Sequence, residues 1–320
     1  MHPRLRDSQR TQEFLEHLLA KFGGVFARPS KRLPTVRCVS RTALSRLLTS
    51  IRDDIGAPGY TSLAPGRMID SLIHAGLLHQ LPVDFGANAG PRTALYLVGL
   101  ETSTENVDPV ELLVGWEPQG VLCFFTALQL HSLTTQVPSH HHSARLTTHA
   151  STRTTRDRGG SSTEEGTDQR RFDPLGILQF RYEGVSYYRT NRESRLMPGT
   201  VGRHFSDKTR CRVTTLEQTL IDALHRPLAC GGPPVVLEAW TRGVSGLSQV
   251  RLHHYLVELG DDRITRRVGY LLEMNDFRSK EPLLGLLDAV KSRSSGATPV
   301  SLLPGLQYVH VDTTWQLTTP

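Results

Sequence analysis

Three polar side chains fall on one face of a predicted helix at residues 65–75, and they are of types that can hydrogen-bond to nucleic-acid bases. They are Arg67, Ser71 and His74. Arg67 is the strongest candidate, because one guanidinium can donate to both O6 and N7 of guanine. Asp70 lies on the same face. Its carboxylate would repel phosphate, but it could pair with Arg67 or accept a hydrogen bond from a cytosine amino group.

Other basic side chains in the first 100 residues could hold phosphate groups without reading base sequence. Arg92 lies at the tip of a predicted hairpin, from which it could reach the flanking backbone or the minor groove. The other candidates are Arg41, Arg46, Lys31 and Arg32. Each arginine alone could equally be a solvated surface charge, but the group together favours a role in binding.

A cluster of carboxylates suggests a different chemistry, that of a magnesium-dependent nuclease. Its members are Glu258, Asp261, Asp262, Glu273 and Asp276. Surface and capping roles are favoured, because two of these residues stand beside Gly260 at a predicted helix–helix turn. The chain has no Gly-rich phosphate loop, no H-E-x-x-H and no G-x-S-x-G motif. We therefore expect no enzymatic activity, no catalytic residue and no cofactor.

Residues 138–171 contain almost no large apolar side chain and are predicted to form a flexible insertion, since such a segment cannot bury enough surface to offset its ordering entropy. The neighbouring His140, His141 and His142, with His149, invite a metal-binding interpretation. Adjacent histidines in a loop are more often simply polar residues, so no metal site is predicted.

The four cysteines lie far apart and form no C-x-x-C pair, which suggests neither a zinc site nor a disulfide framework. No apolar run reaches transmembrane length, and no apolar segment follows Arg4 and Arg6. We expect reduced thiols, no membrane partner and a cytoplasmic location.

The positive charge of the chain is localised. Residues 1–100 contain 13 Lys and Arg against 7 Asp and Glu, whereas residues 101–320 contain 24 of each. The whole formal excess of +6 therefore belongs to the N-terminal third. A localised basic excess is the electrostatic signature of a nucleic-acid-binding module.

The elements predicted in that third would position the basic side chains. Helices are expected at residues 8–22, after Ser40 or Thr42, and at 65–75, where Ile69, Leu72 and Ile73 should point inward. Extended segments are expected at residues 35–39, 77–83 and 93–98, the last two forming a hairpin. This order is that of a winged helix-turn-helix within residues 1–100.

A polar linker at residues 101–109 should lead into a C-terminal domain at 110–320. Strands and helices alternate there, which predicts an α+β chain with a mixed α/β C-terminal domain. A hairpin is expected at residues 175–190, with its turn at Glu183 and Gly184. Helices are expected at 110–114, 121–133, 247–259, 263–274 and 282–291, and a final strand at 306–317.

A helix after residue 213 carries the most distinctive pattern of this domain. Thr214 and Glu217 have the S/T-x-x-E spacing of a capping box. Pro227 should end the helix. Gly231 and Gly232 should then force an irregular connection before a second apolar segment.

This pattern resembles the C-terminal domain of AbiEi-type antitoxins, from the abortive-infection type IV toxin–antitoxin systems. The matching residues are Glu217, Thr219, Leu220, Asp222, Pro227, Gly231 and Gly232. An upstream match resembles the family's Ala-x-x-x-His-x-Leu helix, with Ala127, Leu130, His131, Leu133 and Thr134. A third match covers residues 267–273.

The resemblance implies a repressor that binds inverted repeats of double-stranded DNA in its own promoter. It also implies an antitoxin that counteracts a nucleotidyltransferase-type toxin, without the need for stable direct contact. The insertion at 138–171 and the extended N-terminal region depart from the family. Two alternatives remain open: a transcription factor whose C-terminal domain senses a small ligand, and the magnesium-dependent nuclease.

Overall fold

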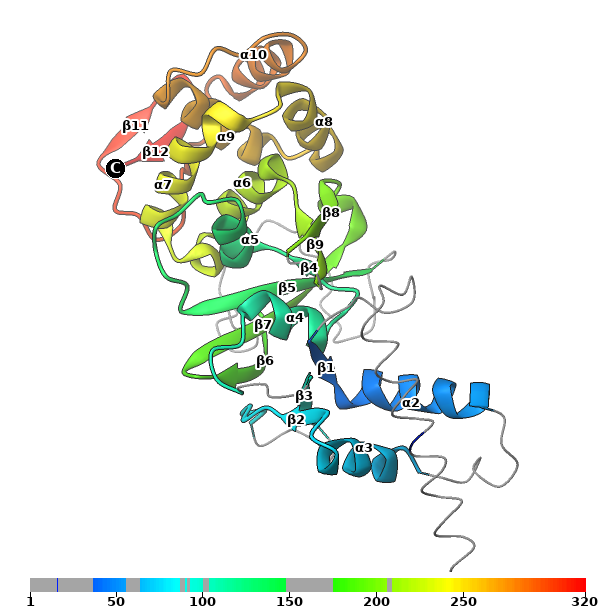
Figure 1. Ribbon diagram of the computed structural model, residues 1–320. Helices are drawn as coiled ribbons and strands as arrows, with labels where there is room; N and C mark the ends of the chain where they lie inside the picture. The colour runs from blue at the N-terminus through cyan, green and yellow to red at the C-terminus, as the bar shows by residue number, and fades with distance from the viewer. Residues whose placement is uncertain are drawn as a thin grey trace, which may run out of the picture. The chain divides into compact units, whose positions relative to one another are not determined.

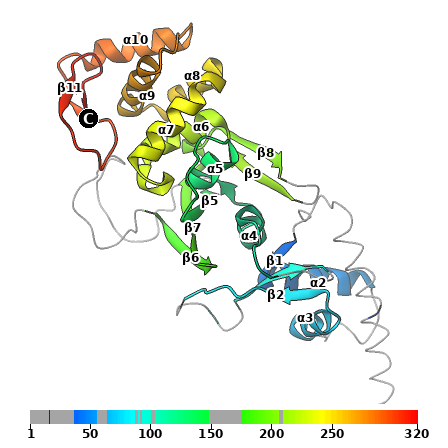
Figure 2. The same cartoon turned by 60° about the vertical axis from the view of Figure 1, so that its left-hand side comes forward.

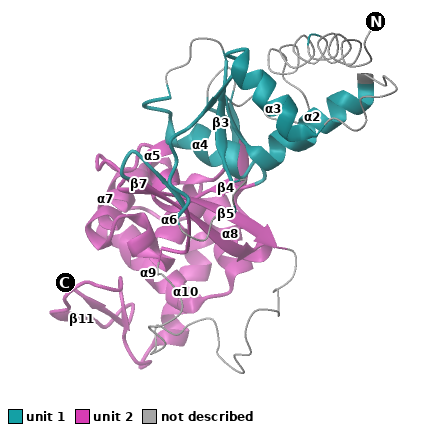
Figure 3. Ribbon diagram, turned by 90° about the horizontal axis from the view of Figure 1, so that it is seen from below, with its two compact units in different colours: residues 1–119, 180–184, 203–211 teal, residues 120–179, 185–202, 212–320 magenta. Residues whose placement is uncertain are grey.

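The structure is a computed structural model, and it describes residues 37–55, 64–86, 90, 93–99, 104–147, 175–205 and 209–320, together with Glu16. It divides into two compact units (Figure 3). The first comprises residues 1–119, 180–184 and 203–211, and the second comprises 120–179, 185–202 and 212–320. Lys31, Arg32, Arg92 and His149 lie outside the described residues, as does the predicted helix at 8–22 apart from Glu16.

Two helices and a three-stranded sheet make up most of the described first unit. The elements are β1 (Cys38–Ser40), α2 (Arg41–Ile55), α3 (Pro65–His74), β2 (Leu78–Gln80) and β3 (Leu95–Val98). β3 is the central strand and pairs antiparallel with both neighbours. The predicted order of elements after residue 37 is confirmed.

The helices α2 and α3 bury apolar faces against each other and against the sheet. On α3 the buried side chains are Met68, Ile69 and Leu72. The prediction that Ile73 points inward is wrong, since its side chain is 37% exposed. Each helical residue is rotated about 100° from the last, which puts Ile73 at the edge of the apolar stripe and Met68 inside it.

A further helix of the first unit, α4 (Pro109–Trp116), begins after the N-cap residue Asp108, whose carboxylate accepts from Val110 N at 2.8 Å. α4 packs closely on β1, because a Cβ added to Gly115 would lie 2.5 Å from Cys38 O. Residues 110–119 therefore belong to the first compact unit, which differs from the predicted boundary at residue 110.

A mixed six-stranded sheet, most of whose residues belong to the second unit, has the order β6-β7-β5-β4-β9-β8. The strands are β4 (Val121–Leu122), β5 (His140–Thr147), β6 (Ile177–Tyr182), β7 (Val185–Glu193), β8 (Thr200–His204) and β9 (Arg210–Thr214). β5 runs parallel to β7, and β4 is antiparallel to β5. The hairpin at 175–190 is confirmed. Its turn residues Glu183 and Gly184 have φ of 49° and 78°, as a two-residue hairpin turn requires.

Residues 140–147 were predicted to lie in a flexible insertion, and this is wrong, since they form β5. His140, His141 and His142 are all buried on it. A composition rule counts histidine as polar, but a neutral imidazole is flat and can stack on aromatic rings. His141 stacks on Tyr187 and His142 stacks on Tyr188.

The helices of the second unit gather on one side of this sheet (Figures 1 and 2). They are α5 (Phe124–Leu130), α6 (Leu216–His225), α7 (Pro233–Gly243), α8 (Gln249–Leu259), α9 (Asp262–Met274) and α10 (Leu283–Ser294). The helix predicted at 121–133 is shorter, because residues 121–122 form β4 instead. α6 ends at His225, before Pro227, as predicted.

The C-terminal segment forms a small sheet of β10 (Val300–Ser301), β12 (Leu317–Thr319) and β11 (His310–Asp312) in that order. A single strand at 306–317 was predicted, and this is wrong because the chain turns at Trp315. The Trp315 ring packs on α9 at Gly269, where an added Cβ would lie 2.1 Å from the ring.

The fold is thus mixed α/β with several sheets. In the described part of the chain, no helix combines the length and hydropathy needed to cross a membrane.

Candidate functional site

The outer face of α3 presents the side chains that the sequence singled out. Arg67, Asp70 and His74 are exposed, and Ser71 is half-buried. The Ser71 hydroxyl donates to Arg67 O at 2.9 Å, and His74 Nδ1 lies 2.9 Å from Asp70 O. Among the described residues, the Arg67 side chain makes no hydrogen bond or ion pair, so the suggested pair with Asp70 does not form. Its guanidinium is available to an external acceptor.

Arg41 occupies the first position of α2, where its backbone N–H donates to Ala94 O at 2.9 Å. Its Nη1 donates to the hydroxyl of Tyr96 at 3.0 Å. Arg41 Nη2 lies 3.6 Å from the position that a Cβ on Gly66 would occupy. Arg41 is therefore held beside the first turn of α3. Arg46, one turn further along α2, is exposed.

The start of α6 differs from the predicted capping box of Thr214 and Glu217. The N-cap is Thr215, whose hydroxyl accepts from Gln218 N at 3.4 Å. Thr214 is instead the last residue of β9, and its hydroxyl lies 2.7 Å from that of Thr219. The helix begins one residue later than predicted because the strand continues through Thr214.

Glu217 does not cap α6, and its carboxylate instead binds residues at the start of α8. Its side chain is fully buried, and it accepts from Arg251 Nε and Nη2 at 3.0 Å each and from Ser248 N at 2.8 Å. Burial by itself raises the pKa of this carboxyl. The bonds from Arg251 and Ser248 outweigh that effect, so the pKa lies below its ordinary value.

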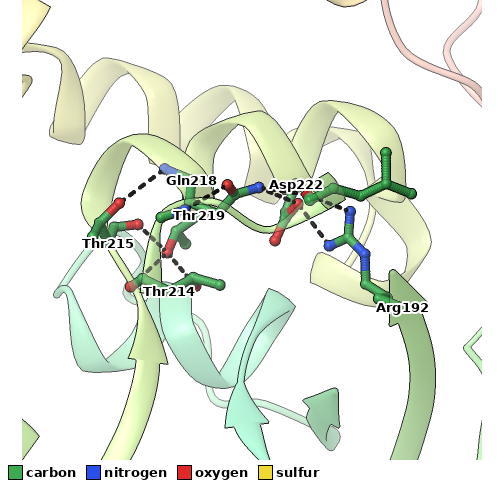
Figure 4. Close-up of polar contacts among 8 residues, drawn as sticks. Arg192, Thr214, Thr215, Gln218, Thr219 and Asp222 are labelled. Atoms are coloured by element: carbon green, nitrogen blue, oxygen red, sulfur yellow. Dashed lines mark hydrogen bonds and ion pairs between the residues drawn. The ribbon is translucent and has the colours of Figure 1, made fainter. Parts of the chain in front are cut away.

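Asp222 points from α6 toward the sheet and meets Arg192 of β7 (Figure 4). Arg192 Nη1 lies 2.7 Å from Asp222 Oδ1, and the same oxygen accepts from Gln218 Nε2 at 2.9 Å. The Arg192 and Asp222 side chains are 8% and 1% exposed. A carboxylate and a guanidinium at these depths are tolerated because each neutralises the other.

Two arginines lie over one aromatic ring next to this pair. Arg192 Cζ is 5.5 Å and Arg226 Cζ is 5.6 Å from the centre of the Phe124 ring, within the range of cation–π attraction. Phe124 begins α5 with φ of 53°, which is uncommon for a bulky residue. Burial and the charge of Arg192 lower the pKa of Arg226.

His142 also contacts the Phe124 ring, in an edge-on arrangement with 5.5 Å between ring centroids. Both ring nitrogens of His142 are buried without a hydrogen-bond partner among the described residues. Burial, followed by the charge of His140, moves the pKa of His142 well below its ordinary value. For the same reasons the pKa of His141 falls to about 4. Both imidazoles are therefore neutral at pH 7.

The remaining residues of the resemblance either hydrogen-bond to the backbone or adopt backbone conformations that favour glycine. His131 Nε2 lies 2.7 Å from Thr214 O and must donate, because a carbonyl can only accept. Gly231 and Gly232 have φ of 90° and 96°, which favour glycine. A Cβ on Gly231 would also lie 2.8 Å from the Phe125 ring.

Three of the five acidic residues that suggested a nuclease are held in separate structural contacts. Asp261 caps α9 by accepting from Arg263 N at 2.8 Å, and Asp262 pairs with Arg293 at 2.9 Å. Glu273 accepts from Lys291 at 2.5 Å and from Trp315 Nε1 at 2.7 Å. No group of three or more His, Cys, Asp or Glu residues that could hold a metal ion occurs in the described ranges.

No protein-family model matches the chain, and the comparison with curated proteins found no match. The comparison with solved structures found a similarity to the crystal structure of the RV2827C protein from Mycobacterium tuberculosis. The two chains are 16% identical over 88% of this chain and 85% of that chain, with a TM-score of 0.48.

Several residues of these sites have no signal in the sequence. Arg192 and Arg251 stand about thirty residues from the carboxylates they bind, and no local spacing links them. Phe124 and Tyr96 read as ordinary core aromatics. On β7 the buried side chains Tyr188, Thr190 and Arg192 occupy every second position, but polar residues also stand between them, so only the structure shows the alternation.

Proposed function

We propose that the chain is a DNA-binding transcriptional regulator with a winged helix-turn-helix in its first unit. The observation that carries the proposal is the amphipathic character of α3. It buries Met68, Ile69 and Leu72 and leaves Arg67 and His74 exposed. A recognition helix needs this division, since one face must anchor it in the protein while the other reads base edges in the major groove.

The surrounding elements support the proposal. α2 precedes α3 and packs against it, as the first helix of a helix-turn-helix does, and β2 and β3 form an antiparallel pair that corresponds to a wing. Arg41 and Arg46 on α2 would contact phosphates. The charge excess of residues 1–100 supplies the electrostatic attraction.

We propose further that the second unit is an AbiEi-type antitoxin domain. The residues that carry the resemblance have structural roles: the buried Glu217 anchors α8, the buried Asp222 pairs with Arg192 of β7, and Gly231 permits a tight turn. A motif that determines the fold in this way supports membership of a structural family rather than a catalytic site. The partner implied is a nucleotidyltransferase-type toxin.

A footprint on the DNA immediately upstream of the protein's own coding region tests the first proposal. At fixed, near-physiological salt, we expect a protected inverted repeat that Arg67→Ala loses. The matched control is Arg278→Ala, which removes the same charge from an exposed position in the second unit and should leave protection unchanged. Equal protection of an unrelated DNA of the same length would overturn the proposal.

Co-expression tests the antitoxin role. The gene adjacent to this coding region should arrest growth when expressed alone and should be tolerated together with the full chain. Rescue by Arg67→Ala would show that neutralisation does not depend on repression. A harmless neighbouring gene would leave the DNA-binding proposal standing and would remove the antitoxin proposal.

A further inference from the structure

Tyr96 places a hydroxyl group in the core of the first unit. Neither the sequence pattern nor the proposed function explains why this buried residue carries a hydroxyl. It lies on the central strand β3, opposite Val39 of β1 and Gln80 of β2, and is 1% exposed. A buried phenol usually has a hydrogen-bond partner for its hydroxyl. Here that partner is the guanidinium of Arg41 at 3.0 Å.

The contact restricts a side chain that would otherwise be free. Arginine has several rotatable bonds, and a surface arginine loses considerable rotamer entropy when it binds a phosphate. Tyr96 comes from a rigid central strand, so the hydroxyl occupies a fixed position. Arg41 Nη2 lies 3.6 Å from the position that a Cβ on Gly66 would occupy, which is an ordinary contact distance, so the guanidinium lies against the first turn of α3.

Gly66 is the second residue of α3, and the first turn of α3 contains no acidic residue. The guanidinium therefore lies at the end of the proposed recognition helix that enters the groove first, with no carboxylate in that turn to neutralise it. A phosphate flanking the major groove would lie close to such a charge.

We infer that Tyr96 is a positioning residue, which orients Arg41 for a DNA phosphate before DNA arrives. This inference rests on the proposed DNA-binding function. It assigns Tyr96 no contact with DNA, and its effect passes through Arg41 alone.

A double-mutant cycle tests the inference, using Tyr96→Phe, Arg41→Ala and the double variant. Affinity is measured by fluorescence anisotropy for a labelled promoter duplex and for an unrelated duplex of the same length. Tyr96→Phe removes only the hydroxyl. We expect this substitution to lower the affinity for both duplexes by the same factor. The factor is about fivefold, which corresponds to the loss of roughly 1 kcal/mol from the hydrogen bond that pre-organises Arg41.

In the Arg41→Ala background, the same substitution should have no effect on affinity. If the hydroxyl had a purely structural role, Tyr96→Phe would lower DNA affinity equally in the wild-type and Arg41→Ala proteins, and this result would overturn the inference. An unchanged affinity of the Tyr96→Phe single variant would also overturn it. Tyr255→Phe, in the buried core of the second unit, is the matched control. Failure of the wild-type chain to bind any duplex would instead remove the proposed function itself, and this inference with it.

Thermal unfolding checks that each variant is folded. A second measurement needs no change at position 96: the guanidinium NMR signals of Arg41, assigned with Arg41→Lys, should be resolved in the free protein. Signals averaged by free rotation of the guanidinium would overturn the inference.

Discussion

Arg192 Nη1 lies 2.7 Å from Asp222 Oδ1, which joins β7 to α6 through two side chains that have almost no contact with water. The second oxygen of Asp222 is buried without a hydrogen-bond partner in the described structure. The pair thus depends on a single close contact supported by Gln218.

Removing one member of this pair should destabilise the second unit strongly. We expect Asp222→Ala to lower the free energy of unfolding by about 3–5 kcal/mol, because it leaves the Arg192 charge buried and uncompensated. The double variant Arg192→Leu with Asp222→Leu should recover most of that loss. Urea unfolding followed by tryptophan fluorescence measures both, and a loss below about 1 kcal/mol for Asp222→Ala would show that solvent reaches Arg192.

Glu217 should contribute stability that acid removes. Its folded-state pKa lies below the ordinary value of 4.5, so the unfolded chain takes up a proton first as the pH falls. The contribution is present above pH 4.5 and is lost as the pH falls through the folded-state pKa. Glu217→Gln should flatten this part of a plot of unfolding free energy against pH. Glu258→Gln, on the exposed side of α8, is its control.

His141 should make stability fall on acidification at a higher pH than Glu217 does. The unfolded imidazole binds a proton below about 6.5, whereas burial keeps the folded one neutral to about pH 4. Stability is therefore full above pH 6.5 and declines between these values by about 1.36 kcal/mol per pH unit. His141→Gln should reduce that slope, and the exposed His254→Gln should not. Equal slopes for both variants would contradict the burial of His141.

Gly269 and Gly285 provide a pair of helix substitutions with opposite expected signs. Gly269→Ala places a Cβ 2.1 Å from the buried Trp315 ring and should cost about 1–3 kcal/mol by overpacking. Gly285→Ala meets only the carboxylate at the end of the Glu281 side chain, at 2.9 Å, and should gain up to about 1 kcal/mol of helix propensity. Thermal unfolding of the two variants distinguishes them, and a stabilising Gly269→Ala would mean that Trp315 packs elsewhere.

Arg46 and Arg67 should affect DNA binding in different ways. Arg46→Ala should lower the affinity for all duplexes by the same factor. It should also reduce the slope of log affinity against log salt concentration by about 0.9, as the loss of one phosphate contact does. Arg67→Ala should cost about 1–3 kcal/mol on the cognate duplex and relax base preference. Titrations at several salt concentrations on cognate and unrelated duplexes separate the two, and the reverse pattern would exchange their proposed roles.

Local signals were sufficient to predict the order of the helices and strands that the structure describes between residues 37 and 99. Pro65 at the start and Gly76 just after the end predicted α3 closely, because both residues act through their own backbone conformation. The hairpin at Glu183 and Gly184 was predicted for the same reason. The capping box was wrong by one residue, since the pattern cannot show that β9 continues through Thr214.

The buried charges of the second unit could not be predicted, because they depend on tertiary contacts. Glu217 fits a capping role by spacing, and only the packing of α8 reveals Arg251 as its partner. The three histidines of β5 were assigned to a loop by composition. Their burial depends on Tyr187 and Tyr188, which lie more than forty residues later in the chain.

The parallel pairing of β5 and β7, combined with the tight hairpin from β6 into β7, has a consequence for protein engineering. Thr147 at the end of β5 pairs with Glu193 at the end of β7. Because β6 runs back along β7 from their two-residue turn, Ile177 at its start lies toward that same end of the sheet. The end of β5 and the start of β6 therefore lie near the same end of the sheet, so a much shorter connection than residues 148–176 could join them. Replacing residues 148–176 with a short Gly/Ser linker should preserve the sheet and shorten the closed loop, and the same position should accept an inserted reporter domain.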